Sequence, residues 1–183
     1  MFIKKLIISI LVILSTATMV GLPRLRAEAV STEDKVKAAY LFNFAKFVEW
    51  PSESFKDSNG FFNICVIGEG PFGNALDSLQ NHELKGKSVK VYRISKAGDT
   101  EECHIAFISS SKKRRLGRVL ADLNGSGVLS ISDIENFAQK GGIINFVKIE
   151  KKIRFEINMK AAERAGLKIS SKLLNLAETI YGK

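Results

Sequence analysis

The chain has 183 residues, of which 45% are hydrophobic and 26% charged, a composition typical of a folded domain and not of a disordered or low-complexity chain. It carries 28 Lys and Arg against 19 Asp and Glu, a formal charge of +9. The two cysteines and two histidines show no C-x-x-C or H-x-x-x-H spacing, which argues against a zinc site.

The N-terminus has the pattern of an export signal. A basic pair, Lys4–Lys5, precedes an apolar run at 6–22, and a small-x-small cleavage site follows at 27–29. We therefore predict a signal peptide over 1–29 and one α/β domain over 30–183. An uncleaved N-terminal anchor is the alternative, because two arginines separate the apolar run from the cleavage site. Either way, we expect the body of the protein to lie outside the cytoplasm.

Export also narrows the class of partner. Cleavage after residue 29 removes four basic residues and one acid, so the charge falls to +6. A modestly basic exported domain favours acidic protein partners or anionic membrane surfaces. Nucleic acid is excluded, because it is not an available ligand in that compartment.

The stretch from Val36 to Pro51, VKAAYLFNFAKFVEWP, places five aromatic residues within eleven positions. It predicts a helix that ends at the Trp50–Pro51 pair, since proline disfavours helical geometry in the residue before it. The helix is apolar around most of its circumference, which indicates either deep burial or a partner surface. Burial of most of these aromatics against the sheet is our interpretation.

Strands and helices alternate along the rest of the chain. Apolar or alternating runs predict strands at 61–67, 89–94, 104–108 and 128–131, and a hairpin formed by 143–149 and 152–157. Helical spacing, Pro71 at a first helical position and Ser132 as a cap predict helices at 72–79, 112–123, 133–140, 159–165 and 170–181. This order predicts a single three-layer α/β domain. We expect a mostly parallel mixed sheet with helices on both faces, and a C-terminal hairpin followed by helices.

The chain has only two cysteines, Cys65 and Cys103. An even number in an exported protein predicts a disulfide, which would stabilise the fold by roughly 3–4 kcal/mol. Two buried free thiols are the alternative.

Two short motifs suggest ligand chemistry. Gly68–Gly73 matches G-x-G-x-x-G between a predicted strand and helix, as in dinucleotide sites, but no acidic residue follows Ile94 at the end of the next strand. We interpret it as a tight turn. Ser109–Lys112 matches S-x-x-K, but the companion motifs of penicillin-recognising enzymes are missing, so we interpret the serines as helix caps.

The strongest basic cluster follows those serines and comprises Lys112, Lys113, Arg114, Arg115 and Arg118. Cations in a first helical turn oppose the helix dipole, so helix stability does not account for them. A solvated face is the commonest explanation of such a run, and contact with an acidic partner or lipid head groups is the alternative. We find no catalytic constellation and predict no cofactor or metal.

Two terminal segments carry a resemblance to a known family. They are VKAAYLFNFAKFVEWP and the region from Arg154 to Leu174, which includes RFEIN and AGLKISSKLL. Together with the strand ICVIG at 64–68 and FAQKGG at 137–142, they make the chain resemble the YfiR-like family of bacterial periplasmic proteins. The match runs in order over nearly all of the chain that follows the signal segment.

The resemblance implies a regulator and not an enzyme. The best-understood family role is repression: the protein binds the periplasmic part of an inner-membrane diguanylate cyclase and holds its catalytic domain inactive. An outer-membrane lipoprotein can sequester the repressor, which raises cyclic-di-GMP and biofilm formation. Family members are often dimeric, so a homodimer is expected, and their disulfides support the fold.

A solute-binding module is the second hypothesis. It would report a small molecule to a sensor kinase or transporter. Its ligand would occupy a cleft at the carboxyl ends of the strands, near 68–73 and 109–111, where ligands bind in open α/β sheets.

Overall fold

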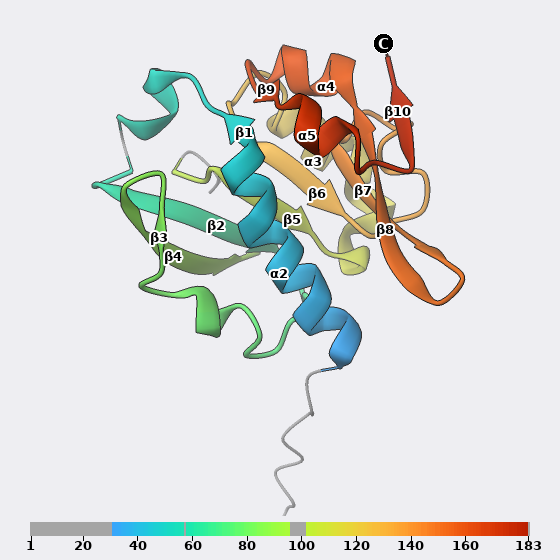
Figure 1. Ribbon diagram of the computed structural model, residues 1–183, viewed down its shortest axis with the longest axis horizontal. Coiled ribbons are helices and arrows are strands. Elements are labelled where there is room, and N and C mark those ends of the chain that lie inside the picture. Colours follow the sequence, from blue (N-terminus) through green and yellow to red (C-terminus); the bar gives the residue numbers. More distant parts are fainter. Residues whose placement is uncertain (1–30, 57, 96–101, 183) are drawn as a thin grey trace, which may run out of the picture.

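The computed structural model of the protein describes residues 31–56, 58–95 and 102–182, and within these residues an eight-stranded sheet runs through the centre (Figure 1). The predicted signal segment 1–29 lies outside them. The strands of the sheet are β2 (Phe61–Ile67), β3 (Glu83–Leu84), β4 (Lys87–Ile94), β5 (Ile105–Ile108), β6 (Leu129–Ser132), β7 (Ile144–Ile149), β8 (Lys152–Asn158) and β10 (Thr179–Tyr181). Their order is β10-β8-β7-β6-β5-β2-β4-β3.

The sheet is mixed and mostly parallel, as predicted. Strands β4, β2, β5, β6 and β7 run parallel to one another, and the short β3 pairs antiparallel with β4 at the edge. Strand β8 pairs antiparallel with β7 through the predicted hairpin, whose turn residues Glu150 and Lys151 both have positive φ. A separate antiparallel pair joins β1 (Val48–Glu49) to β9 (Lys168–Ile169), next to the helices at the end of the chain.

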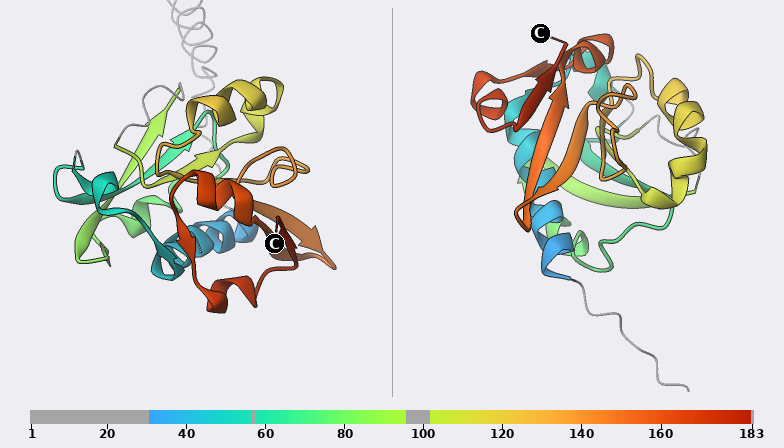
Figure 2. Two further views of the ribbon diagram at one scale, coloured as in Figure 1. Left: turned by 90° about the horizontal axis from the view of Figure 1, so that it is seen from above. Right: turned by 90° about the vertical axis from the view of Figure 1, so that its right-hand side faces the viewer.

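Helices cover both faces of the sheet, so the domain has three layers (Figure 2). On one face α2 (Thr32–Phe47), α4 (Met159–Arg164) and α5 (Ser171–Leu174) share a buried cluster with the sheet. On the other face α3 (Leu116–Asp122) shares a second, smaller cluster. Alternate residues of β2 supply the two clusters, with Ile64 facing α2 and Cys65 facing α3, which explains why that strand is apolar at nearly every position.

The aromatic segment is mostly buried, as predicted. Ser31 caps α2 by accepting a hydrogen bond from the Asp34 backbone N–H at 3.1 Å, and Phe44 is 1% exposed at the middle of the helix–sheet contact. Phe42 and Phe47 are half-buried and pack against the same cluster. The segment therefore acts as core.

Two predicted helices are absent because their backbones leave helical geometry early. The prediction for 72–79 is wrong: the chain makes turns and only a 3₁₀ turn at Asp77–Leu79, and Gly73 has φ of +46°. The prediction for 133–140 is also wrong, since that segment is a series of turns in which Asn136 has φ of +59°. Apolar spacing alone does not register such left-handed residues.

The predicted helix at 170–181 is only partly correct. Ser170 caps α5, but the helix ends at Leu174 and Thr179–Tyr181 forms the edge strand β10 instead. That strand pairs in parallel with β8, and the Glu178 backbone N–H donates to the Phe155 carbonyl at 2.9 Å. Pairing with a distant strand therefore overrides the local helical preference.

Candidate functional site

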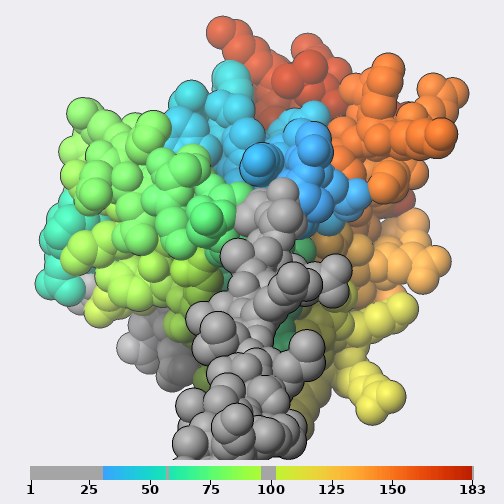
Figure 3. All heavy atoms as spheres, turned by 90° about the horizontal axis from the view of Figure 1, so that it is seen from below, coloured from blue at the N-terminus to red at the C-terminus, as the bar shows by residue number. Residues whose placement is uncertain are grey.

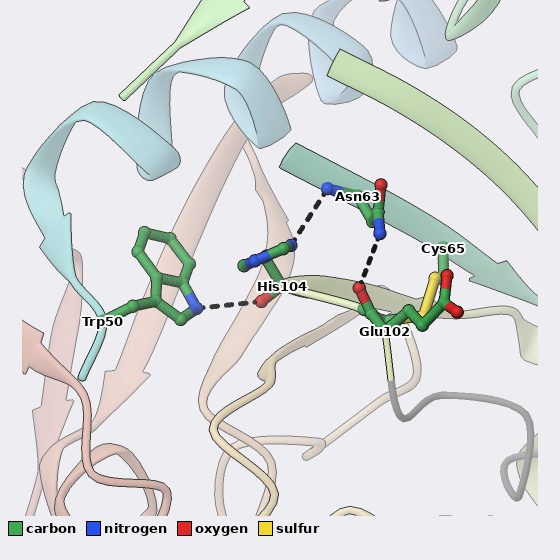
Figure 4. Close-up of a disulfide and its surroundings, with 6 residues drawn as sticks. Trp50, Asn63, Cys65, Glu102 and His104 are labelled. Carbon is green, nitrogen blue, oxygen red and sulfur yellow. Dashed lines mark hydrogen bonds between the residues drawn. A yellow bond between two sulfur atoms is a disulfide. The ribbon is translucent and has the colours of Figure 1, made fainter. Parts of the chain in front are cut away.

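Two clusters of polar residues lie at opposite ends of the parallel strands. The first is at the amino ends of β2 and β5, around His104 (Figure 4). The Nδ1 atom of His104 accepts a hydrogen bond from the Asn63 backbone N–H at 3.0 Å, and the Trp50 indole N–H donates to the His104 carbonyl at 3.1 Å. The Asn63 side-chain amide donates to the Glu102 carbonyl at 2.8 Å. These bonds tie the segment after α2 to the sheet.

His104 is held as a neutral, structural residue. It is fully buried and stacks on Phe55 and Phe62 with ring centroids 4.5 and 4.8 Å away. Burial, and next the positive charge of Lys87, lower the pKa of His104 to about 4. Since Nδ1 accepts a hydrogen bond, the single proton of the neutral ring is on Nε2. The ring is thus a core group.

This burial predicts an acid-sensitive fold. Between pH 6.5 and 4 the unfolded chain protonates His104 and the native chain does not, so stability falls as the pH drops through that window. We expect the free energy of unfolding to fall by about 2 kcal/mol between pH 7 and pH 5. Urea unfolding at several pH values measures this loss.

The control is His104→Asn, which cannot titrate. It is less stable overall but loses the slope between pH 7 and pH 5. Glu33, whose pKa is lowered by its bonds to Lys148 and Lys37, contributes mainly at more acid pH, because a carboxyl with a lowered pKa loses its stabilising effect as the pH falls below its ordinary value of 4.5. An unchanged slope in His104→Asn would refute the assignment.

The disulfide lies close to this cluster. Cys65 and Cys103 are joined, with their Cα atoms 5.9 Å apart. Strands β2 and β5 are parallel neighbours, and Ile64 of β2 lies opposite Ile105 of β5. The residues just before β5, which include Cys103, therefore lie beside β2, which contains Cys65. Both cysteines are buried on the α3 side of the sheet.

The second polar cluster is at the carboxyl ends of the strands. An open pocket of about 470 Å³ lies there. It is lined by Gly68, Glu69, Arg93, Ile94, Ser95, Ser111 and Lys112. The chain passes from β2 to β4 on one side of this point and from β5 to β6 on the other, so the pocket occupies the topological switch point of the sheet, where ligands bind in open α/β folds. We refer to it as the switch-point crevice.

The two loops that form the crevice are tied together. The Ser109 hydroxyl donates to the Glu69 carbonyl, and the Glu69 backbone N–H donates to Ser111 Oγ at 3.2 Å. The Lys112 ammonium reaches across to the Ser95 carbonyl at 2.8 Å. The glycine-rich and serine-rich motifs, 40 positions apart in the sequence, therefore meet at one site.

Both motifs keep their structural interpretation. The glycine turn is not followed by a helix, which removes the helix N-terminus that a dinucleotide site needs. Ser109 caps a 3₁₀ turn, Ser110–Arg115, by accepting from the Ser111 backbone N–H at 3.2 Å. This turn leads directly into α3, so the predicted helix at 112–123 begins as 3₁₀ and continues as α.

The basic segment, Lys112 to Arg118, begins at the crevice and runs into α3. Lys112 is half-buried, and the other four cations of the segment are exposed. Ion pairs among residues 31–56, 58–95 and 102–182 involve other cations. In the space-filling view, side chains from this yellow part of the chain project from the surface (Figure 3). The segment thus presents positive charge to solvent.

Sequence reasoning missed one buried charge, Lys37 on α2. It is 5% exposed, and its ammonium lies 2.7 Å from Asp133 and 2.9 Å from Glu33. Two carboxylates compensate the cost of burying the cation and tie α2 to the turn after β6. The available signal was Lys37 itself, four positions before Leu41 on the apolar side of the helix.

Other site types find no support in the described part of the chain. Its His, Cys, Asp and Glu residues form no group of three or more that could hold a metal ion. Among the same residues, no helix combines the length and the apolar character needed to cross a bilayer.

Comparison with solved structures supports the fold. A conserved domain protein from Vibrio cholerae O1 biovar El Tor str. N16961 has a TM-score of 0.50 and 11% identity, over 80% of this chain and 60% of that one. This chain therefore spans about 60% of that protein's length, and the likeness concerns the fold alone. An ABC domain in complex with L-Trp from Streptococcus pneumonia matches at a TM-score of 0.47 and 11% identity, over 65% of this chain and 55% of its own.

Comparison with curated proteins finds no significant match. A family model described as YfiR/HmsC-like matches residues 34–178, from the first turn of α2 to the residue before the last strand, β10. The chain therefore belongs to the YfiR/HmsC-like family.

Proposed function

We propose that the protein is a periplasmic regulator that binds and represses an inner-membrane signalling protein, most directly a diguanylate cyclase, and so lowers cyclic-di-GMP output. Membership of the YfiR/HmsC-like family over 34–178 carries the proposal, because repression of such a cyclase is the best-understood family role. The protein has no catalytic step in this scheme.

Repression follows from preferential binding. A receptor that exchanges between active and inactive conformations is shifted only by a protein that binds one of them more tightly. The repressor would bind the periplasmic part of the inactive cyclase. A homodimer would present two such surfaces, and sequestration by an outer-membrane lipoprotein would release the cyclase by mass action.

We assign the contact with the cyclase to the basic segment. Its exposed cations form no ion pair with the described residues, so they are available to an acidic surface on the partner. Three of the cations are arginines, whose planar fork binds carboxylates in a bidentate manner. Charge complementarity of this kind sets specificity and association rate.

Charge reversal at two exposed arginines tests the surface. Arg114→Glu with Arg115→Glu is expected to weaken capture of the cyclase from solubilised membranes at least about tenfold, because like charges across an interface cost several kcal/mol. In cells that lack the native gene, this variant fails to lower cyclic-di-GMP, as measured by mass spectrometry.

The matched control is Lys168→Glu with Lys172→Glu. It makes the same change in net charge at exposed positions of β9 and α5, on the opposite face from α3. Equal loss in both variants would refute the surface assignment. Recovery of soluble proteins alone, with unchanged cyclic-di-GMP when the gene is deleted, would refute the function.

One observation favours the second candidate function, a module that binds a small molecule and reports it to a sensor kinase or transporter. The switch-point crevice lies where that hypothesis places the ligand, between 68–73 and 109–111. The two hypotheses do not exclude each other, because the ligand would occupy the crevice and the membrane partner would contact the basic segment.

A further inference from the structure

We propose that the switch-point crevice binds a small organic anion, a phosphate monoester or a carboxylate, and that Lys112 couples this ligand to the basic segment. The first part depends only on the crevice. The coupling rests on the proposed function, because it concerns the partner bound by that segment.

The size of the crevice suits an organic ligand. Its volume of about 470 Å³ falls within the range of roughly 300–1,000 Å³ that is usual for small-molecule sites. A bare oxyanion would leave most of it filled with water. Ile94, at the end of β4, supplies an apolar wall for the body of a ligand.

The charge of the crevice favours an anion. Arg93 enters the lining from β4 and Lys112 from the loop after β5, while Glu69 is the single acid in the lining. Arg93 is oriented through one nitrogen, Nη2, which donates to the Gly73 carbonyl and lies 3.0 Å from an Asp77 carboxylate oxygen. A guanidinium has five N–H donors, so this anchoring commits only one of its three nitrogens. The lining thus holds two cations and one acid, and although Asp77 offsets the charge of Arg93, the other N–H groups of the guanidinium can still donate to an anion.

Gly68 and the loop hydrogen bonds set the positions of the lining residues before any ligand binds. Gly68 has φ of +92°, and a Cβ there would lie 2.6 Å from Ser111 Oγ and 2.8 Å from Lys112 Cε. Glycine at this position lets Lys112 cross over the β2 turn to the Ser95 carbonyl without displacement. The loop contacts of Glu69 with Ser109 and Ser111 fix the other wall. Because the lining is preformed, little binding free energy is lost in ordering its side chains and loops when a ligand binds.

Lys112 belongs to both the crevice and the basic segment. It lines the pocket and is the first cation of the run that continues to Arg118. An anion that pairs with its ammonium reduces the positive charge offered to an acidic partner. By linkage, ligand and partner then weaken each other's binding by the same factor.

An NMR titration tests the ligand site without any partner. Purified protein labelled with ¹⁵N receives glycerol 3-phosphate, succinate or the neutral control glycerol. We expect saturable shifts of the Gly68, Glu69 and Ser111 amide signals with at least one anion and none with glycerol. The two anions distinguish a phosphate source from a carboxylate source.

Single substitutions locate the binding groups. Lys112→Gln and Arg93→Gln should each weaken the anion about tenfold, the usual effect of losing a hydrogen bond to a charged group. The matched control is Lys113→Gln, which removes the same charge one position along, outside the lining, and should change affinity less than about twofold, as expected for a screened surface charge. Absence of saturable shifts with both anions, or equal weakening by Lys112→Gln and Lys113→Gln, overturns the site.

The coupling has its own readout. The anion that binds in the titration is added to the membrane capture assay and is expected to release the cyclase from the native protein. It should release none from Lys112→Gln. Binding in the titration without release overturns the coupling but leaves the site intact, and failure of capture before any anion is added overturns the proposed function instead.

Discussion

Reducing the Cys65–Cys103 bridge is expected to lower the free energy of unfolding by about 4 kcal/mol. The bridge spans 38 residues, and in the chain-entropy model a loop of this length restricts the unfolded chain by about that amount. The bridge acts mainly on the unfolded chain, because in the folded protein backbone hydrogen bonds already hold β2 and β5 together. A loss of this size is a large part of the roughly 5–15 kcal/mol that stabilises an ordinary domain.

Urea unfolding of the oxidised and the reduced protein measures the contribution of the bridge, because the two forms differ in covalent structure only at the two cysteines. Both cysteines are buried, so reduction is carried out in denaturant before refolding. A Cys65→Ala, Cys103→Ala variant is expected to be less stable again than the reduced protein, since it also removes packing in the α3 cluster. Coincident unfolding of the oxidised and reduced forms would contradict the prediction, as would two free thiols by mass analysis.

Phe44→Ala is expected to cost about 3–5 kcal/mol, the range for truncating a buried phenylalanine. Its ring lies 5.5 Å from Tyr40, 5.8 Å from Phe146 and 4.9 Å from Phe155, measured between centroids. The substitution therefore leaves a cavity at the place where α2 meets β7 and β8. It also removes three aromatic contacts.

Phe42→Ala is the matched control on the same helix. Phe42 is half-buried, and its ring contacts the His82 ring edge-on at 5.8 Å and the Lys46 ammonium at 4.6 Å. We expect less than half of the Phe44→Ala loss, and an intermediate loss for Phe44→Leu, which refills part of the cavity. Denaturant midpoints of the three variants give the order. A loss at Phe42 equal to that at Phe44 would mean that α2 packs differently.

Local patterns were sufficient for most of the fold. The strands at 61–67 and 105–108 are apolar apart from Asn63 because both of their faces are covered, and the hairpin at 144–158 alternates around a two-residue turn. The caps at Ser31, Ser109 and Ser170 are also local, since each serine bonds a backbone N–H two or three residues ahead.

The errors occurred where a tertiary contact decides the backbone conformation. The Phe137 backbone N–H donates to the side-chain oxygen of Asn145, in β7, at 3.0 Å, so the segment after β6 is held as turns and not as the predicted helix. Strand β10 forms because it can pair in parallel with β8 at the edge of the sheet. Asn145 acts through a side-chain hydrogen bond that apolar spacing does not register, and β8 lies beyond the local sequence around β10, so in both cases tertiary contacts override local propensity.

The candidate site divides in the same way. The sequence by itself determined the α/β class, the family resemblance, the basic segment and the two loop motifs, because each depends on residues close together in the chain. Only the tertiary structure decided that the glycine turn meets the serine loop, that Lys112 lies across both, and that Lys37 pairs with Asp133, 96 positions away. Parallel strands are the physical reason: they bring the carboxyl ends of separate segments to one edge, so a site assembled there has no continuous signature in the sequence.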